Sequence, residues 1–242
     1  MRTLILDIET VGEDWSDIDE VTQDKLLGWI ERSTQDKKEQ AALAENVKAR
    51  LGLSPLTGSI VALGLCDLER KEGIVYYQSD KERKEEEIDG YALRIRSEKE
   101  LLEDFWEGAK EYDMFVTFNG RRFDIPYILL RSAILGVRPT QDLMKGRYLY
   151  QQGMVRHIDL QDQLTFYGAM QKRPSLHLFT RAFGIDSPKA DGISGEDVAE
   201  LFRMKKFRDI AIYNSKDVTA TAELYKKWFD YLAPEDFEMI IE

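Results

Sequence analysis

The stretch LILDIETVG, residues 4–12, places two acids inside an apolar run. Its apolar residues are typical of a buried β-strand, and Asp7 and Glu9 interrupt them two positions apart. Alternate residues of a strand share a face, so both carboxylates are expected to point the same way. Like charges held that close are unfavourable unless a positive charge lies between them. Either the strand end opens into solvent, or the two acids hold a cation.

Composition limits the classes of protein that fit. The chain has 45 acidic residues among 242, so acid–x–acid pairs arise often by chance, and the pattern gains weight only if other carboxylates join it. A net charge of −11 argues against a broad basic face for long nucleic acid, but not against an enzyme that holds a few terminal nucleotides. The single cysteine, Cys66, indicates a reducing, cytoplasmic setting. No run has the length of a membrane span, so no membrane partner is expected.

The pattern along the chain predicts one α/β domain over 1–242, with a mixed sheet flanked by helices. Segment 12–57 is charged and rich in Gln and Ala, and we expect it to form a helical insertion after the first strand. The charge run 79–90 is expected to be a solvated loop. Strands are expected at 2–9, 58–68, 73–79 and 114–120, and a further one begins at 155. Helices are expected to begin at 97 and to cover 124–136 and 175–185. The chain is expected to be helical again from 194, with a long last helix at 207–231.

A further acid, Asp124, lies in FVTFNGRRFDIPYI, residues 115–128. It follows a predicted strand and a glycine turn, and it begins a predicted helix. Sheets of this class bind ligands at strand ends. Asp also caps helices well, so a helix cap and a metal ligand both stay open for Asp124. The side chain of Asn119, in the same turn, could brace the loop or contact a substrate.

The late helix contains YNSKD, in which Tyr213 and Asp217 are four positions apart and project on one face. Apolar neighbours partly bury that face, and a buried Asp needs a partner. A Tyr–Asp contact at the helix edge and a catalytic role both stay open. Together with Asp7, Glu9 and Asp124, Asp217 would supply four carboxylates, enough to hold two divalent cations, Mg2+ or Mn2+, around a phosphodiester.

The motifs D-x-E in DIET, N-x3-F-D in NGRRFD and Y-x3-D in YNSKD occur in an order that resembles the DEDD superfamily of 3′–5′ exonucleases. That resemblance implies a ribonuclease H-like fold, and the tyrosine is typical of the DEDDy branch found in proofreading domains of DNA polymerases. RHIDLQDQL, SLHLFTRAFGI and residues 195–225 resemble the predicted exonucleases related to the exonuclease domain of family B polymerases. The resemblance runs from residue 1 to about 230. Since no polymerase module follows, a stand-alone nuclease is expected.

The resemblance implies a set of catalytic residues. The metal ligands would be Asp7, Glu9, Asp124 and Asp217, and Tyr213 would position the attacking water. Contacts to nucleic acid are expected from Thr10, Asn119, Phe123 and Lys189. Asp159 follows an apolar strand much as Asp7 does, and we favour a supporting structural role for it.

The expected function is metal-dependent 3′–5′ exonuclease activity at a single-stranded 3′ end, with DNA favoured over RNA and nucleoside 5′-monophosphates as products. Two alternatives stay open: a catalytically silent binding module of the same fold, and an RNA-processing exonuclease. The insertion at 12–57 is longer and more charged than the resemblance leads us to expect. It could restrict access, form a lid over the cleft or recruit a protein partner.

Overall fold

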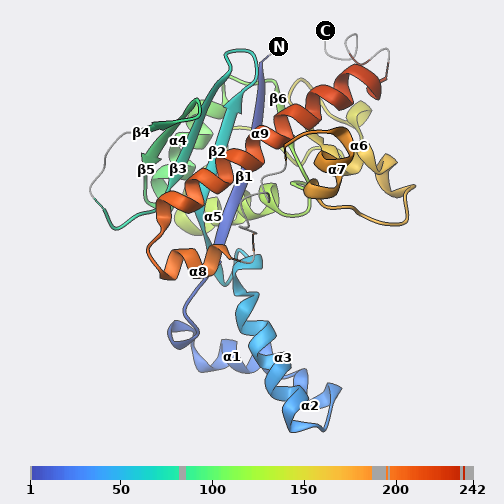
Figure 1. Cartoon of the computed structure of the whole chain (residues 1–242). Coiled ribbons are helices and arrows are strands. Elements are labelled where there is room, and N and C mark those ends of the chain that lie inside the picture. Colours follow the sequence, from blue (N-terminus) through green and yellow to red (C-terminus); the bar gives the residue numbers. More distant parts are fainter. Residues whose placement is uncertain (1, 82–85, 187–194, 196, 235–236, 238–242) are drawn as a thin grey trace.

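The computed structural model describes residues 2–81, 86–186, 195, 197–234 and 237, and a seven-stranded mixed sheet lies at its centre (Figure 1). The strands lie in the order β4-β5-β3-β2-β1-β6-β7. The first strand, β1, is antiparallel to β2 and parallel to β6, as expected for the predicted mixed sheet. The strand bounds are Thr3–Gly12 (β1), Gly58–Asp67 (β2), Glu72–Tyr77 (β3), Glu86–Ile88 (β4), Tyr91–Ile95 (β5), Met114–Thr117 (β6) and Arg156–Asp159 (β7).

Helices cover both faces of this sheet (Figure 1). The long helix α9, Phe207–Tyr231, crosses one face, over β1, β2 and β3. Helices α4, Glu98–Ala109, and α5, Asp124–Leu135, cover the other face. Each face has its own apolar core, because the apolar residues of the strands alternate between the two sides. The result is the predicted α/β architecture of a mixed sheet between helices.

The alternation along β1 decides where its acids point. Ile5 packs into the core under α9, whereas Leu4 and Leu6 pack into the core under α4 and α5. Asp7 and Glu9 have the same parity as Ile5, so they face α9. The two carboxylates therefore share the face on which the late helix lies.

The predicted helical insertion lies between β1 and β2 and extends away from the sheet (Figure 1). At its base, the Thr10 hydroxyl donates to the Gly52 carbonyl at 2.7 Å. The backbones of Gly12 and Gly52 approach so closely that a Cβ on Gly52 would lie 2.8 Å from the Gly12 nitrogen. Beyond this base, two of the helices, α1 and α3, contain no buried residue. The bounds are Glu20–Leu27 (α1), Ile30–Ser33 (α2), Lys37–Ala49 (α3) and a 3-10 turn at Leu51–Leu53.

The prediction of a solvated loop over 79–90 was wrong for the C-terminal part of that segment. Glu86–Ile88 forms β4 at the sheet edge, and β5, which the sequence patterns did not indicate, lies between β4 and β3. The pairing of β5 with β3 is parallel and is set by distant parts of the chain. Arg208 of α9 pairs with Glu86 at 2.6 Å, so part of the charge of this strand is neutralised by the helix that packs on the sheet.

Local signals placed the helix ends correctly. Ser97 and Glu100 form the predicted capping box at the start of α4. Gly136, with a φ of 71°, ends α5 in the left-handed conformation that glycine favours. The predicted break lies at Lys205, whose φ is 58°, between α8 and α9. None of the described helices has both the length and the apolar character that a membrane crossing needs. The remaining helices are Leu160–Leu164 (α6), Leu176–Phe183 (α7) and Val198–Arg203 (α8).

Candidate active site

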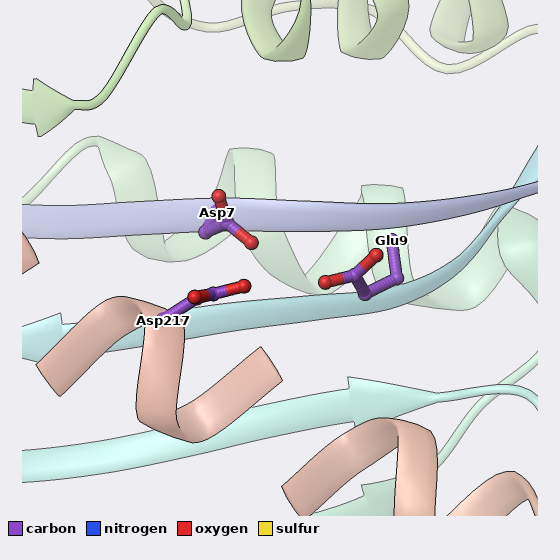
Figure 2. A group of neighbouring side chains, drawn as sticks. All are labelled: Asp7, Glu9 and Asp217. Carbon is purple, nitrogen blue, oxygen red and sulfur yellow. The ribbon is translucent and has the colours of Figure 1, made fainter. Parts of the chain in front are cut away.

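Three carboxylates from opposite ends of the chain meet where α9 crosses β1. Asp7 and Glu9 project from β1, Asp217 projects from α9, and Figure 2 shows the three side chains converging. Carboxylate oxygens of the three residues lie within 4.8 Å of one another. Glu9 is buried, while Asp7 and Asp217 are partly exposed. This spacing is short enough for one cation to contact all three side chains.

The fourth predicted ligand, Asp124, lies beside the strand that carries the first two. β6 pairs with β1 only as far as Ile5, so the backbone of β1 beyond that point is open on this edge. There Asp124 Oδ1 accepts a hydrogen bond from the Ile8 amide at 3.1 Å. Phe123 occupies the N-cap of α5 and makes no side-chain cap bond. The carboxylate of Asp124 thus binds β1 between Asp7 and Glu9, and it does not serve as the N-cap.

The charges in this cluster raise one another's pKa. Burial, then Asp124, Asp217 and Glu9, raise the pKa of Asp7 well above its usual range, while the hydrogen bond from the Asn214 amide opposes this shift. Burial, Asp217 and Asp124 raise the pKa of Glu9 in the same way. Burial raises the pKa of Asp124 to about 7, although its bond from the Ile8 amide opposes the shift. Every charged group that raises these pKa values is another acid.

This environment fits a hard divalent cation. A bound cation would favour the charged carboxylates and remove the repulsion that raises their pKa. Carboxylate oxygens are the ligands that Mg2+ takes, and the described histidines contribute nothing to the cluster. The residues present therefore suit the oxygen-rich metal site that the sequence predicts.

Tyr213 lies one helical turn before Asp217 and is buried. Burial raises the pKa of its hydroxyl, and the charges of Asp217 and Glu9 and a hydrogen bond with Asp217 raise it further. The hydroxyl therefore stays protonated at neutral pH and acts as a hydrogen-bond donor. The Tyr–Asp contact that the sequence left open is present, and it lies inside the carboxylate cluster.

Sequence reasoning missed two residues that hold the site together. Asn214 is fully buried, and its Nδ2 donates to Asp7 Oδ2 at 2.8 Å and to the Asp7 carbonyl at 3.3 Å. Gly64 of β2 pairs with Asp7, and a Cβ there would overlap Asn214 Oδ1 and lie 2.8 Å from Val218 Cγ2. The isolated glycine in the apolar run SIVALGLC was an available signal for such a close approach.

The supporting role expected for Asp159 is confirmed. Its carboxylate accepts from the amides of Asn119 at 2.8 Å, Arg121 at 3.0 Å and Gln161 at 2.9 Å. These bonds fix the turn between β6 and α5, in which Asn119 takes a φ of 64°. Because that turn leads directly to Asp124, Asp159 positions a residue of the site from a neighbouring strand.

A cleft of about 890 Å3 borders the cluster of carboxylates at Glu9. Glu9 lines it, together with the end of β1, the last turn of α3, Phe123 and Ala199 of α8. Its volume falls within the range of roughly 300–1,000 Å3 that is usual for small-ligand sites. The insertion thus forms one wall of the cleft.

The four residues predicted to contact nucleic acid differ in where they lie relative to this cleft. Thr10 and Phe123 line the cleft, although the Thr10 hydroxyl is bound to Gly52. Asn119 is absent from the described lining of the cleft, and its backbone amide is held by Asp159. Lys189 lies outside the described residues.

The model of one protein family matches residues 66–235, more than half of the chain. That family is described as a predicted 3′–5′ exonuclease related to the exonuclease domain of PolB. The chain belongs to this family. The matched range includes Asp124, Tyr213 and Asp217, and it begins after the strand that carries Asp7 and Glu9.

Curated relatives of this exonuclease family member are archaeal DNA polymerases. DNA polymerase 1 of Sulfurisphaera ohwakuensis is 25% identical over 232 residues, which cover 90% of this chain and 26% of the relative. DNA polymerase 1 of Saccharolobus solfataricus is 24% identical over 237 residues, with the same coverage. This chain therefore spans about a quarter of the length of these relatives.

A solved structure shares the fold. The family B DNA polymerase from the archaeon Pyrobaculum calidifontis matches with a TM-score of 0.58 and 18% identity. The match covers 94% of this chain and 24% of that one. The predicted fold class, a ribonuclease H-like mixed sheet flanked by helices, is confirmed.

Proposed function

We propose that this chain is a metal-dependent 3′–5′ exonuclease. It hydrolyses phosphodiester bonds at a single-stranded 3′ end, preferably of DNA, and releases nucleoside 5′-monophosphates. The observation that supports this most directly is the meeting of Asp7, Glu9 and Asp217 within 4.8 Å, with Asp124 bound to the same strand, in a member of an exonuclease-related family. The single free cysteine, Cys66, supports the cytoplasmic location that we propose with it.

Each acid has a part in this proposal. The residues that would hold two divalent cations, Mg2+ or Mn2+, are Asp7, Glu9, Asp124 and Asp217. The chemistry that such ions supply when bound is positive charge on the scissile phosphate and a lower pKa for the attacking water. Asn214 orients the Asp7 carboxylate through its 2.8 Å bond. The cleft beside Glu9 receives the terminal nucleotide, with Thr10 and Phe123 in its walls.

Tyr213 orients the water and does not remove its proton. Its raised pKa keeps the hydroxyl protonated, so it cannot serve as a base near neutral pH. Its hydroxyl lies beside Asp217, where its oxygen can accept a hydrogen bond from a water held by the same carboxylate. We expect Tyr213→Phe to lower kcat on the order of 100-fold while metal binding is kept, because one orienting hydrogen bond is lost.

The test is a paired digestion of DNA and RNA oligonucleotides of one sequence, labelled at the 5′ end, with Mn2+ and with EDTA. The proposal predicts a ladder of shortened, 5′-labelled DNA strands that requires Mn2+. Asp217→Asn is expected to abolish the ladder while the thermal transition is retained. Intact strands under every condition would overturn the proposal, and a ladder on RNA alone would overturn its preference for DNA.

A further inference from the structure

The insertion contains a second cleft, of about 780 Å3, between α1, α3 and its base. Trp29 lines it and is 43% exposed. Lys25 of α1 and Arg50 at the end of α3 also line it. This second cleft is therefore open and mainly apolar, and its lining includes one exposed aromatic ring and two cationic side chains.

The second cleft joins the cleft beside the carboxylates. Asn46 and Arg50 line both of them. Glu9 lines the first cleft and Trp29 the second, so the last turns of α3 form a shared wall between the acidic cluster and the exposed ring. The base of this wall is fixed to β1 by the Thr10–Gly52 bond.

The charge of the second cleft differs from that of the molecule. The chain carries a net charge of −11, yet the described residues that line the second cleft include Lys25 and Arg50 and no acid. Neither cation forms an ion pair with a described carboxylate at 4.0 Å or less. A cation-lined surface that leads to an acidic metal site suits an anionic chain whose reacting end is neutralised by ions.

We propose that the insertion carries a binding track for the single-stranded DNA that precedes the scissile 3′ nucleotide. The strand runs from the cleft at Glu9, past Asn46 and Arg50, to Lys25 and Trp29. This inference rests on the proposed exonuclease function for the position of the 3′ end. The binding surface itself stands on the lining of the two clefts.

Each residue of the track has a physical part. Arg50 and Lys25 contact backbone phosphates, which hold a strand without reading its sequence. The ring of Trp29 stacks on a base, which tolerates any of the four bases because each has a π-face. Asn46 supplies both a hydrogen-bond donor and an acceptor at the shared wall. The insertion would then hold substrate, rather than act as a lid or a site for a protein partner.

The test measures binding of 5′-fluorescein-labelled thymidine oligonucleotides of 3 and 12 nucleotides to the full chain in EDTA, where no cleavage occurs. We expect Trp29→Ala to weaken binding of the 12-mer about fivefold or more, since a stacked base is lost. Arg50→Ala and Lys25→Ala should each reduce the slope of log affinity against log salt by about 0.7. Binding of the 3-mer should be unchanged in Trp29→Ala and Lys25→Ala.

A matched control removes an equal charge elsewhere on the insertion. Lys38 is exposed on α3 and is not part of the described lining of either cleft, so Lys38→Ala should bind the 12-mer as the wild type does. The proposed track would be overturned if the 12-mer bound as tightly as to the wild type in all three variants, Trp29→Ala, Arg50→Ala and Lys25→Ala. A wild-type dimer that Trp29→Ala converts to a monomer, with oligonucleotide binding unchanged, would overturn it too and assign the ring to self-association.

Kinetics separate this inference from the function on which it rests. With Mn2+, the ratio of kcat/KM for the 12-mer to that for the 3-mer should fall at least fivefold in Trp29→Ala, in line with the loss of one stacked base. If the wild type shortens both substrates and this ratio does not change, the track fails and the exonuclease stands. If no strand is shortened but the variants lose binding in EDTA, the exonuclease fails, and the insertion still stands as a surface that binds single-stranded DNA.

Discussion

Asp124 has two roles, because its side chain binds the backbone of β1 and also belongs to the cluster of acids in the candidate site. Its carboxylate accepts from the Ile8 amide where β6 no longer pairs with β1, so it satisfies an amide on the open edge of that strand. The same carboxylate lies among acids and has its pKa raised to about 7, chiefly by burial. An amide side chain could keep the hydrogen bond without the charge. Substitution by Asn therefore separates the structural contribution of Asp124 from its electrostatic one.

We expect Asp124→Asn to stabilise the metal-free protein strongly at pH 8, less at pH 5, and little at pH 4 or below. The folded-state pKa of about 7 lies above the value of about 3.9 for an unfolded Asp. The protonated carboxyl group of Asp124 therefore stabilises the fold fully below about pH 4, and this contribution is lost progressively between about pH 4 and pH 7. In EDTA at pH 8, the variant should melt at least about 2–4 °C higher, the shift that 1 kcal/mol produces in a chain of this size.

Adding Mn2+ should reverse that order. The wild type gains stability when its folded state binds the ion, whereas Asp124→Asn has lost a charged ligand and should gain less. Asp230→Asn, an exposed change on α9, is the control and should melt like the wild type in both buffers. Equal melting temperatures for Asp124→Asn and wild type in EDTA at pH 8 would contradict the cluster of repelling acids.

At the scale of elements, the packing of α9 on β2 sets the distance between the two halves of the site. Gly64 leaves room for Asn214 and Val218, so that α9 approaches the sheet closely and Asn214 reaches Asp7. Asp217 follows Asn214 by three positions on the same helix and therefore depends on the same approach. A methyl group at position 64 would push the helix and its acid away from β1.

We expect Gly64→Ala to lower the free energy of unfolding by about 1–3 kcal/mol and to reduce exonuclease activity. In the double variant with Asn214→Ala, the two losses of unfolding free energy should not add, because the overlap with Asn214 Oδ1 is removed. Chemical denaturation of the single and double variants should give a coupling free energy of about 0.5 kcal/mol or more. Gly108→Ala is the matched control. Nothing lies within 4 Å of a Cβ there, in exposed helix, so it should stabilise the protein by roughly 0.5–1 kcal/mol.

The elements that the sequence predicted well are those with local signals. The start of α4 is determined by the Ser97 capping box, the end of α5 by Gly136, and the bounds of α9 by a long apolar stripe. The strands β4 and β5 were missed because their place depends on pairing with β3 and on Arg208 of α9. From sequence alone, a run of charged residues at an edge strand is predicted to be a loop, because the distant residues that pair with the strand are not known.

At the scale of the molecule, the site depends on contacts that no local pattern contains. The spacing of Asp7 and Glu9 predicted that they share a face, and the parity of β1 places both under α9. Their distance from Asp217 is a property of the sheet order and of the crossing helix. The order of the motifs supplied that link only through resemblance to a family. The part played by Asn214 became visible only once the helix and the strand were in contact, and the isolated Gly64 indicates a close approach without naming its partner.

The insertion differs from the body in how much of it is buried. Neither α1 nor α3 contains a buried residue, whereas most of β1 and β2 is buried. We propose that residues 1–242 nevertheless form one domain, because the base of the insertion is bound to β1 through Thr10 and Gly52. One cooperative thermal transition is therefore expected.

Hydrogen exchange tests this division within one domain. Helices with few buried contacts open locally at low cost, so amides of α1 and α3 should exchange at least about 100-fold faster than those of β1 and β2. Exchange is measured by mass spectrometry on the full chain in EDTA, with α4 as the control helix because its apolar face is buried. Two separate thermal transitions would contradict the single domain. Protection of α1 and α3 equal to that of α4 would show that the outer insertion is held by contacts other than those at its base.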